Sequence, residues 1–230
     1  MKTIGLLGGM SWESSLAYYR SLNLLVKERL GGLHSAKCLL YSVDFQEIET
    51  LQAQDGWDEA GRILSDAALG LEKGGADVLL ICTNTMHKVA PAIQARIKIP
   101  LLHIADPTAR SVLSAGIRKI GLLGTRFTMQ EDFYKGKLIQ DHGLDVVVPN
   151  AEDMHTVDRI IFKELCLGQI KPESKKQYLE IIDRLASAGA EGVILGCTEI
   201  GLLVQPADSN LALFDTTLIH AEAAVDFALD

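Results

Sequence analysis

Short runs of aliphatic residues recur along the chain, and each run ends in glycine or polar residues. Eight of these runs predict strands, at residues 3–8, 37–43, 77–83, 99–104, 119–125, 145–150, 192–198 and 211–216. Apolar positions with helical spacing predict helices over segments that include 15–30, 58–73, 89–97 and 175–188. Strands that alternate with helices are typical of parallel sheets flanked by helices, so the pattern predicts an α/β fold.

Two stretches of the chain occur twice in similar form. KTIGLLGG (2–9) resembles RKIGLLGT (118–125), and GGADVLLICTNT (74–85) resembles SAGAEGVILGCTEI (187–200). The second pair aligns Thr83 with Cys197, an offset of 114 residues (197 − 83). We infer two pseudo-symmetric α/β lobes, formed by residues 1–100 plus 210–230 and by residues 101–209, with the active site in the cleft between them. The alternative is that two unrelated α/β units merely share a strand-and-glycine composition.

The run Val78–Ile81 stops at two adjacent residues that are both able to do chemistry, Cys82 and Thr83. Successive residues of a strand point to opposite faces, so only one of the two can face a site at the strand end. The internal repeat indicates that Thr83 is the residue that faces the site. Cys82 is therefore expected to be a small buried hydrophobe in the core, unless a bulge at the strand end turns it round.

Acid/base groups on opposite walls of a cleft suit the inversion of a carbon that bears an acidic hydrogen. One group removes the proton from one face and the second returns a proton to the other. Cysteine suits this work because its surroundings can lower its pKa from about 8.5 toward neutrality. Donors for a substrate carboxylate are available in Asn84, Thr85 and Thr198, and in the Gly-rich turn that opens the first helix. That turn is not GxGxxG, so dinucleotide binding is not expected.

The stretches IGLLGGMS, CTNTMH, GCTEIGLL and FDTT resemble the aspartate/glutamate racemase family, the cofactor-independent amino-acid racemases that use two cysteines. The resemblance covers essentially the whole chain. It implies two pseudo-symmetric lobes, a homodimer and a free amino acid as substrate. Aspartate and glutamate are the expected substrates. The second catalytic cysteine of the family falls on Cys197. The residues that hold the substrate fall on Met10, Ser11, Asn84, Thr85, Thr198 and Glu199, with Gln52 as a further contact.

The chain departs from the family at its first catalytic position. The family motif is Cys-Asn-Thr, and here Thr83 stands in the place of the cysteine. A hydroxyl is far less acidic than a thiol, so Thr83 is able to donate or relay a proton but is a poor base. The resemblance implies that Cys197 handles the L-enantiomer, so we expect racemisation to work better in one direction than in the other.

Several further residues are open to more than one interpretation. Lys163 and Glu164 belong to a segment that contributes to the substrate pocket in some relatives. Glu199 either fixes the loop of Cys197 or touches substrate. The remaining candidates are interpreted as structural: His87, His103, His220, Cys38 and Cys166.

Composition narrows the class of protein. Hydrophobic residues make up 48% and charged residues 23% of the 230 positions, and the formal net charge is −8, which argues against nucleic-acid or anionic-membrane partners. Gly8-Gly9 break the amino-terminal apolar run, which we interpret as a strand and not as a signal peptide. The four cysteines show no CxxC or metal-ligand spacing, so reduced thiols in the cytoplasm are expected.

No lysine stands in a setting typical of a pyridoxal Schiff base, so no cofactor is expected. The lack of metal-ligand spacing among the cysteines means that no metal is expected either. Two alternatives remain beside an aspartate or glutamate racemase. One is a broad-specificity amino-acid racemase or a related hydantoin or maleate isomerase. The other is a non-catalytic protein that binds an acidic amino acid.

Overall fold

The computed structural model describes all 230 residues and contains two parallel sheets, each flanked by helices. The predicted α/β fold is confirmed. The chain divides into a first unit, Met1–Ile104 with His220–Asp230, and a second unit, Ala105–Ile219. None of the helices is both long and apolar enough to cross a membrane.

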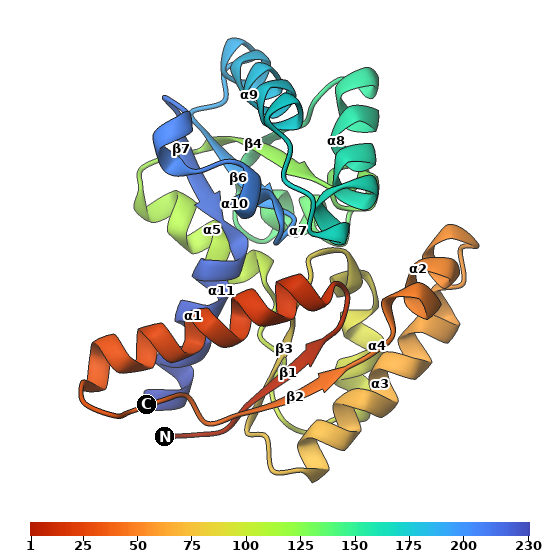
Figure 1. The fold of residues 1–230 in the computed structure, drawn as a ribbon, viewed down its shortest axis with the longest axis vertical. Helices are drawn as coiled ribbons and strands as arrows, with labels where there is room; N and C mark the ends of the chain where they lie inside the picture. Colours follow the sequence, from red (N-terminus) through yellow and green to blue (C-terminus); the bar gives the residue numbers. More distant parts are fainter. The chain divides into compact units, whose positions relative to one another are not determined.

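The first unit is built on a three-stranded sheet in the order β2-β1-β3 (Figure 1). The bounds of its strands are β1 Ile4–Gly8, β2 Cys38–Ser42 and β3 Val78–Ile81. The bounds of its helices are α1 Trp12–Leu30, α2 Phe45–Ala53, α3 Trp57–Lys73, the 3-10 turn η1 Thr85–Val89, α4 Ala90–Arg96 and α11 Thr216–Leu229, which begins in the second unit.

Alternation along β3 divides the apolar core of the first unit between the two faces of its sheet. Leu79 and Ile81 pack with residues of α2, α3 and α4 on one face. Val78 and Leu80 pack with residues of α1 and α11 on the other face, where α1 runs across the sheet in Figure 1. Burial on both faces explains why β3 is an unbroken aliphatic run.

The second unit is built on a four-stranded sheet in the order β5-β4-β6-β7. The bounds of its strands are β4 Lys119–Gly124, β5 Asp145–Val147, β6 Gly192–Gly196 and β7 Ala212–Asp215. The bounds of its helices are α5 Ala105–Ser114, α6 Arg126–Gln130, α7 Lys135–Gln140, α8 Ala151–Lys163, α9 Pro172–Ser187 and α10 Ile200–Leu203, with 3-10 turns η2 Leu165–Leu167 and η3 Pro206–Asp208. A core cluster joins α8, α9 and α10 to the sheet.

Two details differ from the sequence-based expectation. Residues 99–104 form no strand: only Leu101 bridges to Leu79, Pro100 has no N–H to give a ladder, and the N–H of Ile104 is bonded to the ring of His87. Residues 210–219 belong to the second unit and not to the amino-terminal lobe, because β7 pairs with β6 in the second sheet.

The internal repeat extends to the register of the two sheets. Ile4 pairs with Val78 in the first sheet, and Ile120 pairs with Gly192 in the second. Val78 and Gly192 are separated by the same 114 residues (192 − 78) that separate Thr83 from Cys197. Each of the two candidate residues therefore lies five positions beyond a matched strand residue.

The loops that lead into β3 and β6 repeat the same hydrogen bonds. Asp77 N donates to Thr3 O at 2.8 Å, and Glu191 N donates to Lys119 O at 2.8 Å. The preceding glycines are matched too, with φ of +97° at Gly75 and +93° at Gly189. Shared composition alone does not produce matched registers and matched turns, so the repeat is structural.

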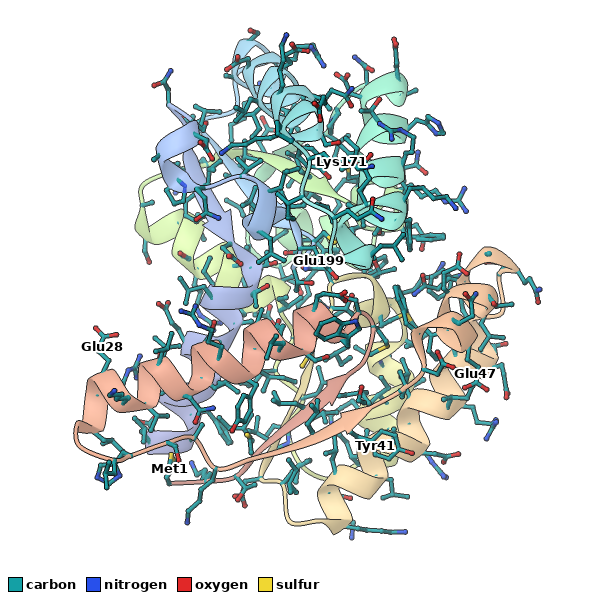
Figure 2. The ribbon with its side chains drawn as sticks, in the orientation of Figure 1. Met1, Glu28, Tyr41, Glu47, Lys171 and Glu199 are labelled. Carbon is teal, nitrogen blue, oxygen red and sulfur yellow. The ribbon has the colours of Figure 1, made fainter.

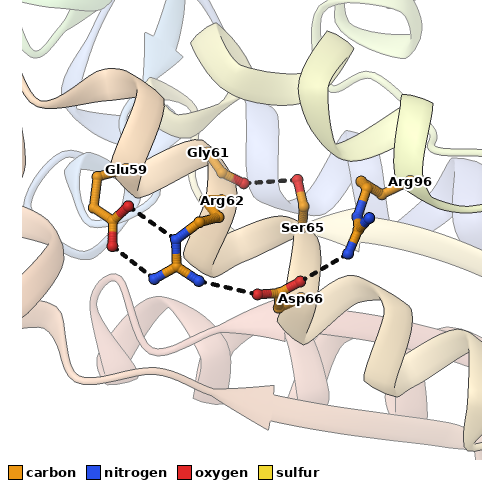
Figure 3. A network of polar contacts seen from close by, with 6 residues as sticks. All are labelled: Glu59, Gly61, Arg62, Ser65, Asp66 and Arg96. Atoms are coloured by element: carbon orange, nitrogen blue, oxygen red, sulfur yellow. Dashed lines mark hydrogen bonds and ion pairs between the residues drawn. The ribbon is translucent and has the colours of Figure 1, made fainter.

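The solvent-facing side of α3 carries a network of ion pairs (Figure 3). Arg62 lies 2.6 Å from Oε1 of Glu59 and 3.2 Å from Asp66, which also lies 3.2 Å from Arg96 of α4. All four side chains are about half exposed or more, so each pair stabilises the fold by less than about 1 kcal/mol. The network marks this face of α3 as a solvated surface.

Candidate active site

The end of β3 separates its two candidate residues as the alternation predicts. Cys82 is buried in the core cluster between β1, β3, α1 and α11, beside Tyr18 and Leu80. Burial raises the pKa of its thiol above the ordinary value. The expectation that Cys82 is a buried hydrophobe is confirmed, and no bulge turns it outward. Thr83 is the next residue and is half-buried.

Side chains, in place of a neighbouring strand, hold the backbone where β3 stops. Cys82 N donates to Leu7 O at 2.9 Å, which is the last bond of this kind to β1. The next two carbonyls accept from side chains: Ser14 Oγ donates to Cys82 O at 2.5 Å, and His87 Nδ1 lies 2.9 Å from Thr83 O. The strand end is therefore tied to the first turn of α1 and to η1.

The Gly-rich turn after β1 is closely packed. Gly9 has a φ of +91°, and a Cβ there would lie 2.2 Å from Val43 O, so only glycine fits. Ser11 is the N-cap of α1, and its hydroxyl accepts from Ser14 N at 3.3 Å. Met10 and Ser11 are both buried. Glu13, in the first turn of α1, has a carboxylate oxygen that is buried without a hydrogen-bond partner, and no sequence motif marks this acceptor.

The three remaining candidates of the first unit are also buried. Asn84 precedes η1, and Thr85 is its first residue. Gln52 lies on α2 and donates from Nε2 to Met86 Sδ at 2.8 Å, which brings α2 to the same turn as Asn84 and Thr85. Six of the predicted site residues thus come together at the carboxyl edge of the first sheet, where parallel α/β sheets bind ligands. They are Met10, Ser11, Gln52, Thr83, Asn84 and Thr85.

In the second unit, Cys197 lies directly after β6, and its neighbours form one hydrogen-bonded group. The Cys197 thiol donates to Oε2 of Glu199 at 3.0 Å, and the Thr198 hydroxyl donates to the same oxygen at 2.6 Å. All three side chains are buried, and Glu199 is labelled in Figure 2. Of the two roles expected for Glu199, contact with the Cys197 loop is the one observed.

The surroundings of Cys197 raise the pKa of its thiol well above the ordinary value, the opposite of the lowering by which a cysteine becomes a ready base. Burial contributes most, because it disfavours the charged thiolate. The negative charge of Glu199 is the next cause, and the hydrogen bond from the thiol to that carboxylate acts in the same direction. Cys197 is therefore held as a thiol, with a proton acceptor already in place.

Cys166 also belongs to this group, although its sequence context indicated packing only. It lies in η2, and its thiol donates to the other carboxylate oxygen of Glu199, Oε1, at 3.8 Å. The two thiols thus approach the two oxygens of one carboxylate. Nothing in the sequence signals this contact, because Cys166 and Glu199 are 33 positions apart and Glu199 lies in the turn before α10.

Glu164 and Lys163 have different surroundings. The carboxylate of Glu164 is buried, with Ser174 Oγ on one oxygen and Arg159 at 3.1 Å and Lys171 at 3.8 Å on the other (Lys171 is labelled in Figure 2). Burial alone would raise its pKa, but these three partners outweigh burial and hold the pKa below its usual value. Both oxygens are occupied, so the structure gives Glu164 an anchoring role. Lys163 ends α8, is exposed and makes no ion pair.

A cavity of about 380 Å³ lies elsewhere in the second unit. Its lining includes Ser111, Leu195, Gln205, Phe214 and Asp215, and none of the predicted site residues. No three or more His, Cys, Asp or Glu side chains are grouped so as to hold a metal ion.

Comparison with known proteins matches residues 7–224 to the model of the Asp/Glu/hydantoin racemase family. A crystal structure from Yersinia pestis, provisionally described as an Asp/Glu racemase, is 55% identical over the full length of both chains, with a TM-score of 0.92. An aspartate racemase homologue from Pyrococcus horikoshii OT3 is 37% identical over the full length of both chains, with a TM-score of 0.86.

A broad-specificity amino-acid racemase of Bacillus subtilis (strain 168) is 25% identical over 172 residues, which cover 73% of this chain and 72% of that protein. The family match spans both units and both candidate strand ends. The chain is therefore an isomerase that belongs to the Asp/Glu/hydantoin racemase family.

Proposed function

We propose that this chain racemises free aspartate or glutamate without a cofactor, by proton transfer between Cys197 and Thr83 on opposite faces of the α-carbon. The observation that carries the proposal is the pair formed by Cys197 and Glu199, a thiol donating at 3.0 Å to a buried carboxylate at the end of β6. The matched registers of the two sheets support Thr83 as its counterpart.

Before Cys197 can remove the α-proton of the substrate, its thiol must become a thiolate. In the proposed step the thiol proton passes to Oε2 of Glu199, and the thiolate then removes the α-proton of the L-enantiomer. The positive α-ammonium of a bound substrate favours this transfer, because it offsets the negative charge that the step places on sulfur. Glu199 is thus the proton acceptor that prepares Cys197.

Inversion requires a proton on the other face. The Thr83 hydroxyl donates it to the carbanion, the resulting alkoxide regains a proton from water, and Glu199 gives its proton to the hydroxide that is left. This step is slow in either direction, because the hydroxyl is a weak acid and its alkoxide a costly base. Exchange of the L-enantiomer with solvent needs Cys197 alone, so we expect it to outrun inversion.

The substrate carboxylate is proposed to lie at the carboxyl edge of the first sheet. Ser11 caps α1, a helix of 19 residues whose free N–H groups and positive end favour an anion. Asn84 and Thr85 supply side-chain donors at the neighbouring strand end. The Thr198 hydroxyl beside Cys197 donates to Glu199 in this structure, and in the proposal it turns to the substrate carboxylate when Glu199 takes up the thiol proton. The exposed and unpaired Lys163 is the proposed contact for an acidic substrate side chain.

A homodimer is also proposed. Trp12, Leu16 and Tyr19 of α1 are 63%, 56% and 51% exposed, and their spacing places them on one stripe of the helix. Large exposed apolar side chains that lie together often mark a protein interface. Sedimentation at several concentrations tests this, and a Leu16→Lys variant that sediments as the parent does would remove the support.

The experiment that tests the function is α-proton exchange in deuterated water with a panel of free amino acids, followed by mass spectrometry and chiral analysis. Cys197→Ser should abolish exchange, and Cys38→Ser, a matched thiol-to-hydroxyl change on β2, should not. Labelling confined to aspartate and glutamate supports the proposed substrates. Labelling of many amino acids favours the broad-specificity alternative. Binding that raises the melting temperature without any labelling favours the non-catalytic one.

A further inference from the structure

His87 uses both of its ring nitrogens in hydrogen bonds within the first unit. Nδ1 lies 2.9 Å from the carbonyl oxygen of Thr83, and Nε2 lies 3.2 Å from the backbone nitrogen of Ile104. A carbonyl only accepts and a backbone N–H only donates. The ring must therefore be neutral with its proton on Nδ1, so that it donates to Thr83 and accepts from Ile104.

The partners of this ring are informative. Thr83 is the candidate catalytic residue beyond the end of β3, where no neighbouring strand holds the chain. Ile104 is the last residue of the first unit before the chain enters the second. One buried imidazole, only 1% exposed, thus fixes the backbone of Thr83 to the segment at which the chain leaves the unit.

The neighbouring ring of His220 is likewise held by two hydrogen bonds, and neither of them goes to Thr83. His220 lies 2.9 Å from both Tyr18 Oη and Leu102 O, so its Nε2–H donates to the carbonyl and its Nδ1 accepts from the phenol. The ring centroid of His87 lies 4.5 Å from that of His103 and 5.9 Å from that of His220. Of the hydrogen bonds described for these rings, the one to Thr83 comes from His87.

We propose that His87 is a positioning residue for Thr83, holding the threonine backbone through its Nδ1–H so that the hydroxyl meets the substrate carbon. The inference rests on the proposed function and adds a residue to it. The hydroxyl is a weak proton donor, so its step depends on placement: a misplacement of about 1 Å can slow a reaction by on the order of a hundredfold. Cys197, in the other unit, does not depend on this bond.

The test is the ratio of two rates measured on pure L-substrate in deuterated water. Exchange of the α-proton reports Cys197, and formation of the D-enantiomer reports Thr83 as well. Loss of folded protein lowers both rates together and leaves their ratio unchanged. A merely structural role for His87 would therefore not change the ratio.

Two amide variants separate the two nitrogens of the ring. The side-chain nitrogen of His87→Asn lies as many bonds from Cβ as Nδ1 does, so this variant can still donate to Thr83. In His87→Gln the amide oxygen and nitrogen lie as many bonds from Cβ as Nε2 does. The glutamine oxygen can therefore accept from the N–H of Ile104, but the amide nitrogen lies too far out to donate to Thr83 O. His220→Gln is the matched control, a buried histidine of the same cluster that has no bond to Thr83.

We expect the ratio of inversion to exchange to stay within about twofold of the parent in His87→Asn and His220→Gln, and to fall by on the order of tenfold in His87→Gln. A parental ratio in His87→Gln, or an equal fall in the control, overturns the positioning role while the proposed function stands. A parent that exchanges no α-proton overturns the proposed function, and the positioning role with it.

Discussion

The Cys197 thiol donates to the Glu199 carboxylate across 3.0 Å, two positions further along the chain. The negative charge of this carboxylate favours the protonated thiol over the thiolate. The same carboxylate is also the group that can accept the thiol proton. The charge of Glu199 adds to burial in raising the pKa of Cys197, so the resting thiol is an acid that becomes a base only when Glu199 takes its proton.

Glu199→Gln should therefore have two opposed effects. The amide carries no charge, so the pKa of Cys197 falls relative to the parent, although burial still holds it above the ordinary value. The amide also takes up no proton, so exchange of the L-substrate should fall by about a hundredfold or more, the usual effect of removing a general base. Alkylation of Cys197 against pH, read by mass spectrometry, measures the first effect, and isotope exchange measures the second.

Glu180→Gln is the control for that variant, since Glu180 is an exposed residue of α9 with one distant lysine partner. It should leave both the alkylation midpoint and exchange as in the parent. If Glu199→Gln exchanges at the parental rate, another group receives the proton of Cys197.

Cys82→Ala should affect stability and not turnover. Cys82 is 1% exposed in an apolar cluster, and removal of its sulfur leaves a small void, which should lower the free energy of unfolding by roughly 1 kcal/mol. Urea unfolding measures this loss. A folded Cys82→Ala protein that still exchanges the L-enantiomer but no longer forms the D-enantiomer would mean that this thiol, and not the Thr83 hydroxyl, acts on substrate.

The fold should lose stability in acid partly through His220. Burial, which disfavours the charged imidazolium, is the main cause that lowers the pKa of His220 to about 3, against 6.5 for the free side chain. Between these values the unfolded chain binds a proton that the folded protein does not. The contribution of His220 is thus fully present above about pH 6.5 and is lost as pH falls toward 3, by at most about 1.4 kcal/mol per pH unit.

Urea unfolding of the parent and His220→Gln at about pH 7.5 and about pH 5 isolates this contribution, because the other titrating groups cancel in the difference. The stability gap between the two proteins should narrow at the lower pH. A gap that stays constant or widens would contradict the depressed pKa of His220.

Much of the architecture was predictable because it follows from periodicity. Alternation along β3 and the repeat offset together predict that Cys82 is buried and that Thr83 is the residue equivalent to Cys197, and the structure confirms both. The prediction that the chain returns to the amino-terminal lobe at residue 210 was wrong, because the pairing of β7 with β6 places residues 210–219 in the second unit. The strand at 99–104 was wrong because Pro100 and the bond from Ile104 to His87 interrupt a run that is otherwise suitably apolar.

The candidate site was predictable as a set of residue types but not as a set of contacts. The position of Cys197 at a strand end follows from sequence. The raised pKa of its thiol does not, because it depends on where the bend after β6 points the carboxylate of Glu199. The contact of Cys166 with that carboxylate and the bond of His87 to Thr83 likewise arise from loops and 3-10 turns, which periodicity does not specify.

The central claim is that Cys197 and Thr83 act on opposite faces with unequal strength. Its most direct test is the initial rate of α-proton exchange in deuterated water from pure L-substrate and from pure D-substrate, in the parent and in Thr83→Cys. The parent should exchange the L-enantiomer much faster, because only the D-enantiomer must lose its proton to a hydroxyl. Enantiomers are equal in free energy, so the equilibrium stays one to one and the asymmetry shows only in rates.

A thiol at position 83 should raise exchange from the D-enantiomer by on the order of a hundredfold. Equal rates from both enantiomers in the parent, or no gain for the D-enantiomer in Thr83→Cys, would contradict the account.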